Sequence, residues 1–566
     1  MPPISTPHSL FGPTTAAPGA GAAPASQSGY CYLFPDLARR ADVGCFRGAT
    51  PTESFQRLKT FEKDSRTALS TPQVLPMRLA AVYTYFGQFV NHDISAPVGD
   101  VVTLADPPEG TGVIDTGLPP GLDRVRRAAP AGILGHFVKE QGAPPALGSP
   151  YGGGAGSARP AIRALYAPDG KRFRLGRTRR EPDQFFKDKG RKPERIHHDT
   201  GAPDILRLDG KPLIADRRND ENLIVSQLHL ALMLVHNKAV AALEGETPGA
   251  AECFAKARQL VTLHYHWLIL HDFLANLLSP ATLQTPFAAR PQKLPAPRLV
   301  PLEFTTAAFR FGHSMVGATY DFNKNFGRGG RFDRAGAKLR ELFDFTTHRN
   351  MGHPELAETL LLPDHWVIDW DRMTRRPKTA AGPVPAPISG PGGAERIDLT
   401  FAPEMLSVMG SSEIAAHGSI LFRNLMRGYQ RRIAFGQALA AACGLPALDA
   451  DQLRAALPES LPGKKGLREL TEELGMLEET PAWLYMLAEA RHHGQGEHLG
   501  PVASEIIADT ITGLMRHMPQ SILNHAGGTW HPRQSPLKGP GNRALTSLRA
   551  FLRFAVQEPH SGLAPA

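Results

Sequence analysis

Two long apolar segments constrain the fold of this chain more than any other feature. Residues 221–245, ENLIVSQLHLALMLVHNKAVAALEG, and residues 253–278, CFAKARQLVTLHYHWLILHDFLANLL, have helical spacing and a wide apolar face. A helix that is apolar over most of its surface needs partners on several sides. Histidines interrupt both segments, and no apolar run approaches the ~18 residues that a membrane span needs. We therefore expect two buried core helices and no membrane span.

Helical spacing also dominates the rest of the chain, for example at residues 78–92, whereas strand-like runs such as 171–177 are few and short. The chain has 566 residues with 42% hydrophobic content, and its 55 glycines and 51 prolines predict long loops. We expect a mainly α-helical fold, with one large domain at 29–556 between a disordered tail at 1–28 and a short tail at 557–566. Further helices are expected at residues 303–315, 402–409, 411–427, 429–443, 449–456, 467–474, 480–491 and 501–518.

Charge and cysteine content exclude several classes of protein. The net charge is +9, and much of the basic excess lies in residues 170–199, either as a solvated loop or as a surface for an anionic partner. No nucleic-acid-binding motif accompanies it. The first 28 residues lack the basic and apolar regions of a Sec signal peptide. Cys31 and Cys45 could pair across a short loop in an exported protein, but free thiols are the default expectation.

The stretch YFGQFVNHDISAP, residues 85–97, carries Gln88, Asn91, His92 and Asp93 inside an apolar helical pattern. Buried polar groups are costly unless each has a partner. Gln88 and His92 are spaced i, i+4 and therefore share one helix face. Either these groups are satisfied locally, as most core histidines are, or something binds against that face.

Two further stretches combine basic and polar residues with apolar surroundings. His313 lies in AAFRFGHSMV, with Arg310 one turn before it, and it could face an iron or serve as a core histidine. Arg218 lies in IADRRNDENL at the entrance of the long helix, where Asn219 or Asp220 is the expected N-cap.

A last polar pair lies in LFRNLMRGYQRR, residues 421–432, where Asn424 and Arg427 are spaced i, i+3 on an apolar helix. A buried asparagine needs hydrogen-bond partners for both ends of its amide. The sequence therefore predicts a partner for Asn424 from another element.

In their order along residues 30–555, these segments resemble the animal-type haem peroxidase family (peroxidase–cyclooxygenase superfamily), in particular its bacterial members. GQFVNHD resembles the distal-histidine box, RNDENLIVSQLH the catalytic-arginine box and AFRFGH the proximal-histidine box. LFRNLMRG followed by ACGLP resembles the segment that supplies the partner of the proximal histidine. TPAWLYMLAEARHHGQGEHLGPVASEIIADTITGLM resembles the C-terminal helical region. The resemblance implies a single haem-peroxidase-like helical domain.

The resemblance also implies an activity and a distal site. His92 would be the distal base, Arg218 the distal arginine and Gln88 a hydrogen-bonding neighbour. The protein would reduce hydrogen peroxide through a ferryl intermediate and oxidise a small reducing substrate, organic or (pseudo)halide. Such an activity would serve a response to oxidative stress.

On the opposite side of a haem b, the resemblance makes His313 the axial ligand of the iron. Asn424 would accept a hydrogen bond from the other ring nitrogen of His313, which raises the basicity of a ligating imidazole. Arg310 and Arg427 would contact the haem edge.

The sequence departs from the family at the positions that link haem covalently. Many relatives esterify haem through an Asp just before the distal histidine, but this chain has Asn91, and an amide cannot form that ester. Glu221 is retained at the second ester position. Strong chloride oxidisers carry a Met after that Glu, whereas this chain has Asn222. We expect at most one ester link, through Glu221, and no vigorous chloride oxidation.

The family's calcium site uses the Asp after the distal histidine, which is present as Asp93. The other ligands would come from ALGSPYGGG, residues 146–154, but Ala146 and Gly148 have no side-chain oxygen. Calcium prefers about 6–8 oxygen ligands. The sequence therefore disfavours a calcium site at Asp93. The alternative role for Asp93 is a hydrogen bond at the end of its helix.

Two other functions are compatible with these motifs. A fatty-acid dioxygenase of the same superfamily would need its catalytic Tyr three residues before the proximal histidine, where this chain has Arg310. A non-enzymatic haem-binding or adhesive protein would not need His92, Arg218 and His313 together. The electron donor, the oligomeric state and the compartment stay open, since many relatives are extracellular but no Sec signal is visible.

Overall fold

The computed structural model describes residues 29–69, 77–95, 129–135, 145–208, 210–247, 249–295, 299–332, 336–347, 361–375, 393–406, 419–458 and 466–557. The predicted tail at 1–28 and all but the first residue of the tail predicted at 557–566 lie outside these ranges. So do residues 407–409 and 411–418 of two predicted helices.

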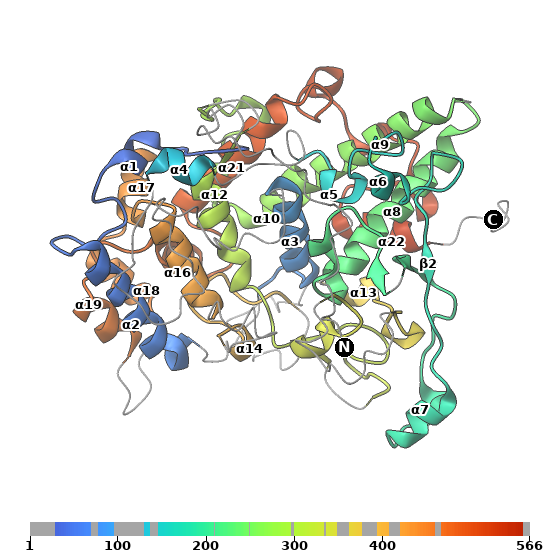
Figure 1. The fold of residues 1–566 in the computed structure, drawn as a ribbon, viewed down its shortest axis with the longest axis horizontal. Helices are drawn as coiled ribbons and strands as arrows, with labels where there is room; N and C mark the ends of the chain where they lie inside the picture. Colours follow the sequence, from blue (N-terminus) through green and yellow to red (C-terminus); the bar gives the residue numbers. More distant parts are fainter. Residues whose placement is uncertain are drawn as a thin grey trace, which may run out of the picture.

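The two long apolar segments form the core pair of one half of the molecule. Helix α8 (Leu223–Leu243) packs along α9 (Ala250–Trp267), and α22 (Leu548–Val556) packs on α8 (Figure 1). By length and composition, α8 is the one described helix that could cross a membrane, but 83% of its apolar window is buried inside the protein. The expectation of a core helix is confirmed.

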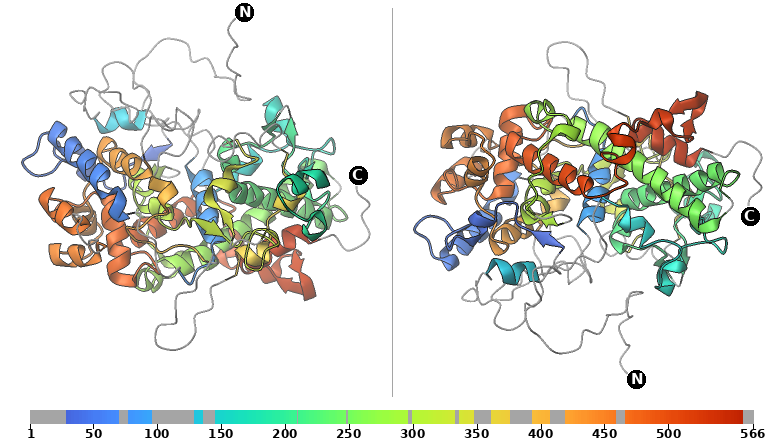
Figure 2. Two further views of the ribbon diagram at one scale, coloured as in Figure 1. Left: turned by 90° about the horizontal axis from the view of Figure 1, so that it is seen from below. Right: turned by 90° about the horizontal axis from the view of Figure 1, so that it is seen from above.

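A second group of helices forms the other half. Helix α16 (Ile420–Gln430) packs against α2 (Pro51–Leu69) and α20 (Ala482–Gly494), and α20 packs against α21 (Pro501–Arg516). Helix α3 (Val82–Ile94) lies between the two groups in all three views (Figures 1 and 2). The remaining helices of the described residues, all short, are α1 (Pro35–Arg39), α4 (Pro130–Gly135), α5 (Gly148–Tyr151), α6 (Pro160–Arg163), α7 (Asp183–Asp188), α10 (Ala275–Leu277), α11 (Pro280–Leu283), α12 (Leu302–Thr306), α13 (Trp370–Met373), α14 (Pro403–Leu406), α17 (Gly436–Ala442), α18 (Ala450–Ala456) and α19 (Leu467–Glu473).

Several predicted helices differ from the structure at their boundaries, and the helix predicted at 429–443 is reduced to α17 (Gly436–Ala442), because α16 ends at Gln430. The helix predicted at 303–315 breaks at Ala307, whose φ of −124° and ψ of −66° are not helical, into α12 and the 3-10 helix η7 (Ala308–His313). Helix α16 runs on to Gln430, past the predicted end at 427, and Arg432 then adopts a φ of +55°. The second long segment continues beyond α9 as a π-helical turn, η5 (Leu268–Leu274), before α10.

Strands are short, as expected. The described strands form five two-residue pairs, of which β1 (Tyr30–Cys31) with β6 (Val300–Pro301) is parallel. The run at 171–177 contributes only one bridge at Phe173 and the strand β2 (Gly176–Arg177). The antiparallel pairs are β2 with β3 (Pro203–Asp204), β4 (Arg207–Leu208) with β5 (Lys211–Pro212), β7 (Thr319–Tyr320) with β8 (Ala337–Lys338), and β9 (Lys538–Gly539) with β10 (Arg543–Ala544).

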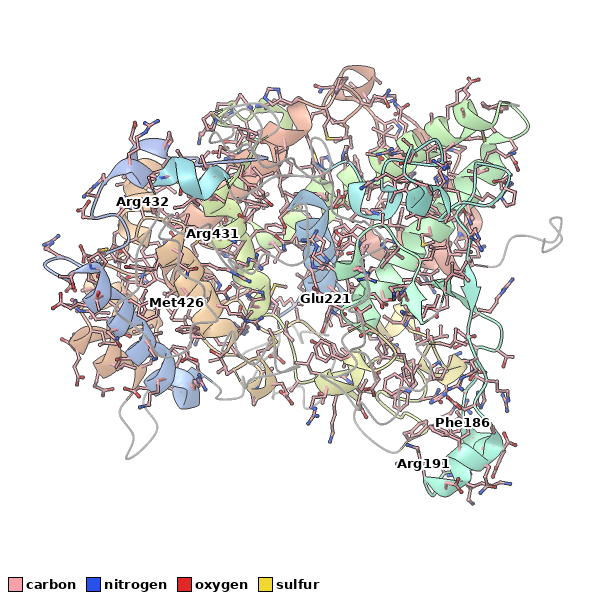
Figure 3. All side chains as sticks on the ribbon, in the orientation of Figure 1. Phe186, Arg191, Glu221, Met426, Arg431 and Arg432 are labelled. Carbon is pink, nitrogen blue, oxygen red and sulfur yellow. The ribbon has the colours of Figure 1, made fainter. Side chains whose placement is uncertain are left out.

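The basic segment at 170–199 includes an arm that projects from the body of the protein, with α7 at its tip near the labelled residues Phe186 and Arg191 (Figure 3). Cys31 and Cys45 are both free, so the alternative of a disulfide between them is not realised.

Candidate functional site

Helix α3 presents His92 with one ring nitrogen held and the other open. The Nδ1 atom lies 2.9 Å from Oδ1 of Asn219, and the histidine is only 6% exposed. The Nε2 atom is 3.8 Å from the carboxylate of Glu221, which is beyond hydrogen-bond range. Burial and the neighbouring Arg218 lower the pKa of His92, so its imidazole is neutral at pH 7.

Arg218 is anchored to this histidine's helix. It lies in the 3-10 helix η4 (Arg217–Asp220), and its Nη2 donates to the backbone carbonyl of His92 at 2.6 Å. Its Nε and Nη2 also donate to the carboxylate of Asp216 at 3.0 and 2.7 Å. Burial works against the charged form, but Asp216 raises the pKa of Arg218 above its ordinary value. The guanidinium is therefore a rigid, charged neighbour of His92.

The predicted helix cap at this entrance is wrong. Asn222 caps α8, with its Oδ1 accepting from the backbone N–H of Val225 at 3.0 Å, whereas Asp216 caps η4. Asp220 instead pairs through both carboxylate oxygens with Arg207, and Asn219 bonds to His92. The sequence did not decide which residue caps each helix, because Asp and Asn, which are both good caps, recur here over seven positions.

Gln88 and Glu221 complete the distal side, by which we mean α3 and η4 together. Gln88 donates to the carboxylate of Glu221 at 3.0 Å and accepts from the side-chain amide of Asn222 at 3.1 Å. The shared helix face of Gln88 and His92 thus meets one carboxylate, as their spacing predicted. Both ends of the Gln88 amide are used.

The proximal side, formed by η7 and α16, joins His313 to Asn424. The side-chain amide nitrogen of Asn424 lies 2.8 Å from Nδ1 of His313, and the amide oxygen is buried without a partner among the described residues. The two ends of an amide are nearly isosteric, and exchanging them places the oxygen on a protonated Nδ1. In that arrangement Nε2 of His313 is unprotonated. Burial first, and then Arg310, lower the pKa of His313 well below its ordinary range.

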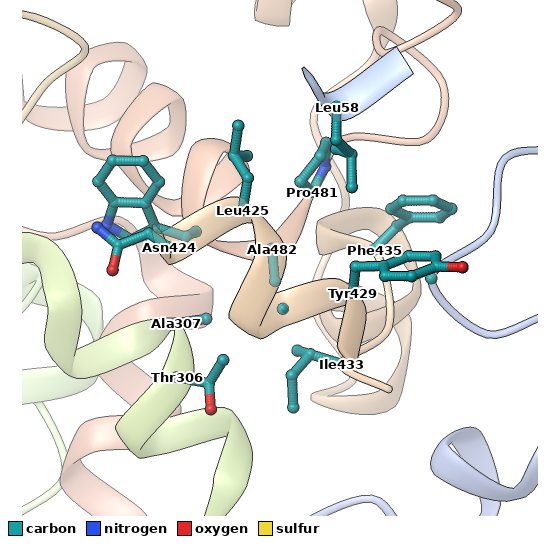
Figure 4. Close-up of a pocket in the computed structure, with 13 residues that line it drawn as sticks. Leu58, Thr306, Ala307, Asn424, Leu425, Tyr429, Ile433, Phe435, Pro481 and Ala482 are labelled. Atoms are coloured by element: carbon teal, nitrogen blue, oxygen red, sulfur yellow. The ribbon is translucent and has the colours of Figure 1, made fainter. Parts of the chain in front are cut away.

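A small cavity lies behind Asn424. Its volume is about 20 Å³, and its wall includes Asn424, Thr306 and Trp483 (Figure 4). A cavity of this size is large enough for one water molecule.

Two arginines of the proximal side, Arg310 and Arg427, have no acidic partner among the described residues, whereas the charge of Glu221 acts on the third, Arg423. Arg310, Arg423 and Arg427 are half-buried, and Nε of Arg423 is buried without a hydrogen-bond acceptor. Burial and then the charges of Arg431 and Arg218 lower the pKa of Arg310 to about 10. Burial and the neighbouring arginines also lower the pKa of Arg427. Such a cluster favours an anionic ligand.

The distal and proximal sides lie against each other. Helix α3 packs on η7, and Oγ1 of Thr84 donates to the backbone carbonyl of Met315 at 3.2 Å. The charge of Arg218 acts on Arg310 across this contact. Arg218, Arg310 and His313 are surrounded by protein and still keep accessible surface. All three therefore keep some surface that solvent can reach.

Asp93 is hydrogen-bonded to a neighbouring loop. Its two carboxylate oxygens accept from the backbone N–H groups of Leu147 and Ser149 at 2.9 and 3.0 Å. No cluster of three metal-binding side chains occurs in the part of the chain that the structure describes. The residues around Asp93 therefore do not fit a calcium ion, which needs several oxygen ligands.

Sequence reasoning missed three residues of the distal side. It did not connect Asp216 to Arg218, Asn219 to His92 or His229 to Asn219, although each pair is hydrogen-bonded. The one signal for His229 was its polar ring on an otherwise apolar helix. A polar ring at that position predicts a hydrogen-bond partner but does not identify which residue it is.

Together these features define a class: a mainly helical protein that carries two histidines and several arginines on elements packed against one another. Residues 182–355 match the family model described as Animal haem peroxidase. The matched segment contains Arg218, Glu221 and His313. No match was found among curated proteins.

The chain is similar to several solved structures at low sequence identity. A fatty acid alpha-dioxygenase from Oryza sativa is 13% identical with a TM-score of 0.50, over 87% of this chain and 81% of that chain. Peroxidase A from Dictyostelium discoideum is 16% identical with a TM-score of 0.46, over 86% and 88% of the two chains. The Arabidopsis thaliana fatty acid alpha-dioxygenase is 11% identical with a TM-score of 0.48, over 88% and 74%. The rice structure shows the fold and no more.

Proposed function

We propose that this protein is a haem-dependent peroxidase that reduces hydrogen peroxide and oxidises small organic or (pseudo)halide donors. The observation that carries the proposal is a pair of imidazoles on packed elements. His92 has an open Nε2 beside Arg218, and His313 is hydrogen-bonded to Asn424. The family match supports haem as the cofactor and peroxide as the substrate.

The distal side provides acid–base chemistry. His92 is neutral, so its Nε2 can take a proton from one oxygen of hydrogen peroxide and return it to the other oxygen as the O–O bond breaks. Over the whole reaction one peroxide takes up two electrons and two protons and leaves as two water molecules, with the donor supplying the electrons. Positioned acid–base catalysis contributes ~10²–10⁴-fold to such rates.

Arg218 stabilises the negative charge that develops on the leaving oxygen. It stays protonated because Asp216 raises its pKa, and its two bonds to that carboxylate fix its direction. A charged donor that is oriented before the reaction needs no reorganisation when charge develops, and such donors contribute ~10²–10³-fold.

The proximal side fits a haem. His313 would hold the iron through Nε2, and Asn424 would orient the ring by accepting from Nδ1–H. Arg310 and Arg427, which have no acidic partner among the described residues, would hold the two propionate groups. Haem, when bound, supplies the redox chemistry that amino-acid side chains lack.

The residues beside the site limit the covalent links that the protein could form with haem. Asn91 cannot form an ester, and Glu221 is the one carboxylate at a family linkage position, held by Gln88 at 3.0 Å. We therefore propose haem b with at most one ester, through Glu221. Extraction of the haem with acid and acetone would measure the covalently retained fraction.

A fatty-acid dioxygenase is the second candidate, because solved dioxygenases share this fold. Arg310 disfavours it, since relatives that oxidise lipids carry a catalytic tyrosine at that position. Oxygen uptake with linoleate in the absence of peroxide would favour the dioxygenase over the peroxidase.

The decisive experiment compares the wild type with His313→Ala. The haem-loaded wild type should show a Soret band that changes on addition of peroxide and should turn over a guaiacol-type donor. His313→Ala should lose the band. A wild type that binds haem but has no turnover would instead be a non-enzymatic haem-binding protein.

A further inference from the structure

Asn219 connects the distal histidine to a second, fully buried histidine. Its side chain is 0% exposed, and its Oδ1 lies 2.9 Å from Nδ1 of His92. Its Nδ2 lies 3.0 Å from Nδ1 of His229 and 3.2 Å from Oγ of Ser149. His229 and Ser149 are themselves buried, at 1% and 2% exposure.

The partners of Asn219 select one orientation of its amide. In the orientation described, both N–H donors are used, by His229 and Ser149, and the oxygen accepts from His92. The reversed orientation would direct one N–H at His92 and leave the other buried without an acceptor among these partners. An unsatisfied buried donor is costly, so the described orientation is favoured.

His229 suits the acceptor role that this orientation requires. Burial lowers the pKa of His229 to about 4, so its ring is neutral at pH 7 and one ring nitrogen carries a lone pair. The ring is also held in place, with Phe89 of α3 in edge-to-face contact at 6.4 Å between centroids. A neutral ring with its proton on Nε2 can accept from Asn219 at Nδ1.

We propose that Asn219 is a positioning residue that keeps the proton of His92 on Nδ1, and that His229 and Ser149 hold Asn219 in the orientation that does so. The tautomer of a histidine is set by the hydrogen bond that its other nitrogen makes. With the proton on Nδ1, Nε2 carries the lone pair and can accept a proton. The inference rests on the proposed function, because an open Nε2 is useful only if His92 is the base.

The first test reads the tautomer directly. Nitrogen-15 NMR of the full chain labelled at histidine, with His92→Gln to assign the signals, reports which ring nitrogen of His92 carries the proton. It is measured with haem in the diamagnetic ferrous carbon monoxide form and on the chain without added haem. The wild type should carry the proton on Nδ1. A wild type with the proton on Nε2 overturns the proposal.

Two substitutions separate positioning from packing. Asn219→Leu keeps the size but removes the acceptor, and it should shift His92 toward the Nε2–H form. The rate with peroxide should then fall about 10- to 100-fold, the range seen when the hydrogen-bond partner of a functional histidine is lost. Asn219→Asp keeps an acceptor and should retain the Nδ1–H form and recover most of the rate. An unchanged tautomer and rate in Asn219→Leu would refute the role, as would loss of the Nδ1–H form in Asn219→Asp.

A matched control uses Asn237 on the same helix as His229. Its amide bonds both backbone groups of Phe173, at 2.8 and 3.0 Å, and does not reach the site. Asn237→Leu should lower stability but leave the tautomer of His92 and the rate unchanged. If the wild type neither binds haem nor turns over peroxide, the proposed function fails, while the tautomer of the haem-free chain still decides the role of Asn219.

Discussion

The distal and proximal sides differ in whether a carboxylate pairs with the arginine beside each histidine. On the distal side, Arg218 is paired with Asp216, and Gln88 uses both ends of its amide. On the proximal side, Arg310 and Arg427 have no acidic partner among the described residues. Arg218 is thus paired before any ligand binds, whereas Arg310 and Arg427 are compensated only with an anion present. The distal side is not complete in other respects, because Oδ1 of Asn91 and Nε of Arg217 are buried without a hydrogen-bond partner among the described residues.

The largest expected effect is on the proximal side. His313→Ala removes the nitrogen that would hold the iron, so the Soret band of the haem-loaded protein should be lost. His492, exposed on α20, provides the control, and His492→Ala should bind haem as the wild type does. Titration with haem, followed by absorption, measures both variants. Full haem affinity in His313→Ala would assign the ligand to another residue.

The next effect belongs to the distal side alone. His92→Leu should keep haem but slow the reaction with peroxide by ~10²–10⁴-fold, because the proton acceptor is lost. Stopped-flow absorption measures this rate against peroxide concentration. If His92→Leu lost haem and His313→Ala kept it, the assignment of the two sides would be reversed.

The stability of the haem-free chain tests the contrast between paired and unpaired arginines. Arg218→Leu leaves Asp216 without its partner and should lower the free energy of unfolding by about 3–5 kcal/mol. Arg427→Leu removes a cation that has only like charges near it, and should raise that free energy by on the order of 1 kcal/mol. Urea unfolding of both variants without haem gives the two values. Equal destabilisation by both would contradict the comparison.

The smallest effect is the response of the distal side to acid. The pKa of His229 is about 4 in the fold, below its ordinary 6.5, so the unfolded chain binds more protons between these values and stability rises with pH there. On acidification from pH 6.5 to 5, this histidine should cost about 2 kcal/mol of stability. Urea unfolding of the wild type and His229→Gln at both pH values isolates its share. A pH response that is the same in both would assign the acid sensitivity to other groups.

The sequence predicted the helical fold well because local spacing carries that information. The apolar segments at 221–245 and 253–278 became α8 and the α9–η5–α10 run, since their periodicity reflects burial along one element. The break at Ala307 was missed because its neighbours keep a helical apolar period, and only tertiary packing shows where that period is interrupted.

The candidate site was predictable to the level of residue type and face. The i, i+4 spacing predicted that Gln88 and His92 share a face, and both lie near the carboxylate of Glu221. The burial of Asn424 predicted a hydrogen-bond partner, which is His313. The cap residues could not be predicted, because local preference does not distinguish Asn219 from Asn222. Both can cap a helix, but Asn219 hydrogen-bonds to the distant His92, whereas Asn222 caps α8.

The sequence by itself determined the secondary structure and the chemical groups available, because both depend on residues near one another along the chain. Only the tertiary structure decided which nitrogen of His92 is held, which arginines lack a carboxylate, and that α3 lies against η7. These properties depend on hydrogen bonds and charges between residues more than a hundred positions apart. Proton location and uncompensated charge follow from three-dimensional neighbours, and no local pattern encodes them.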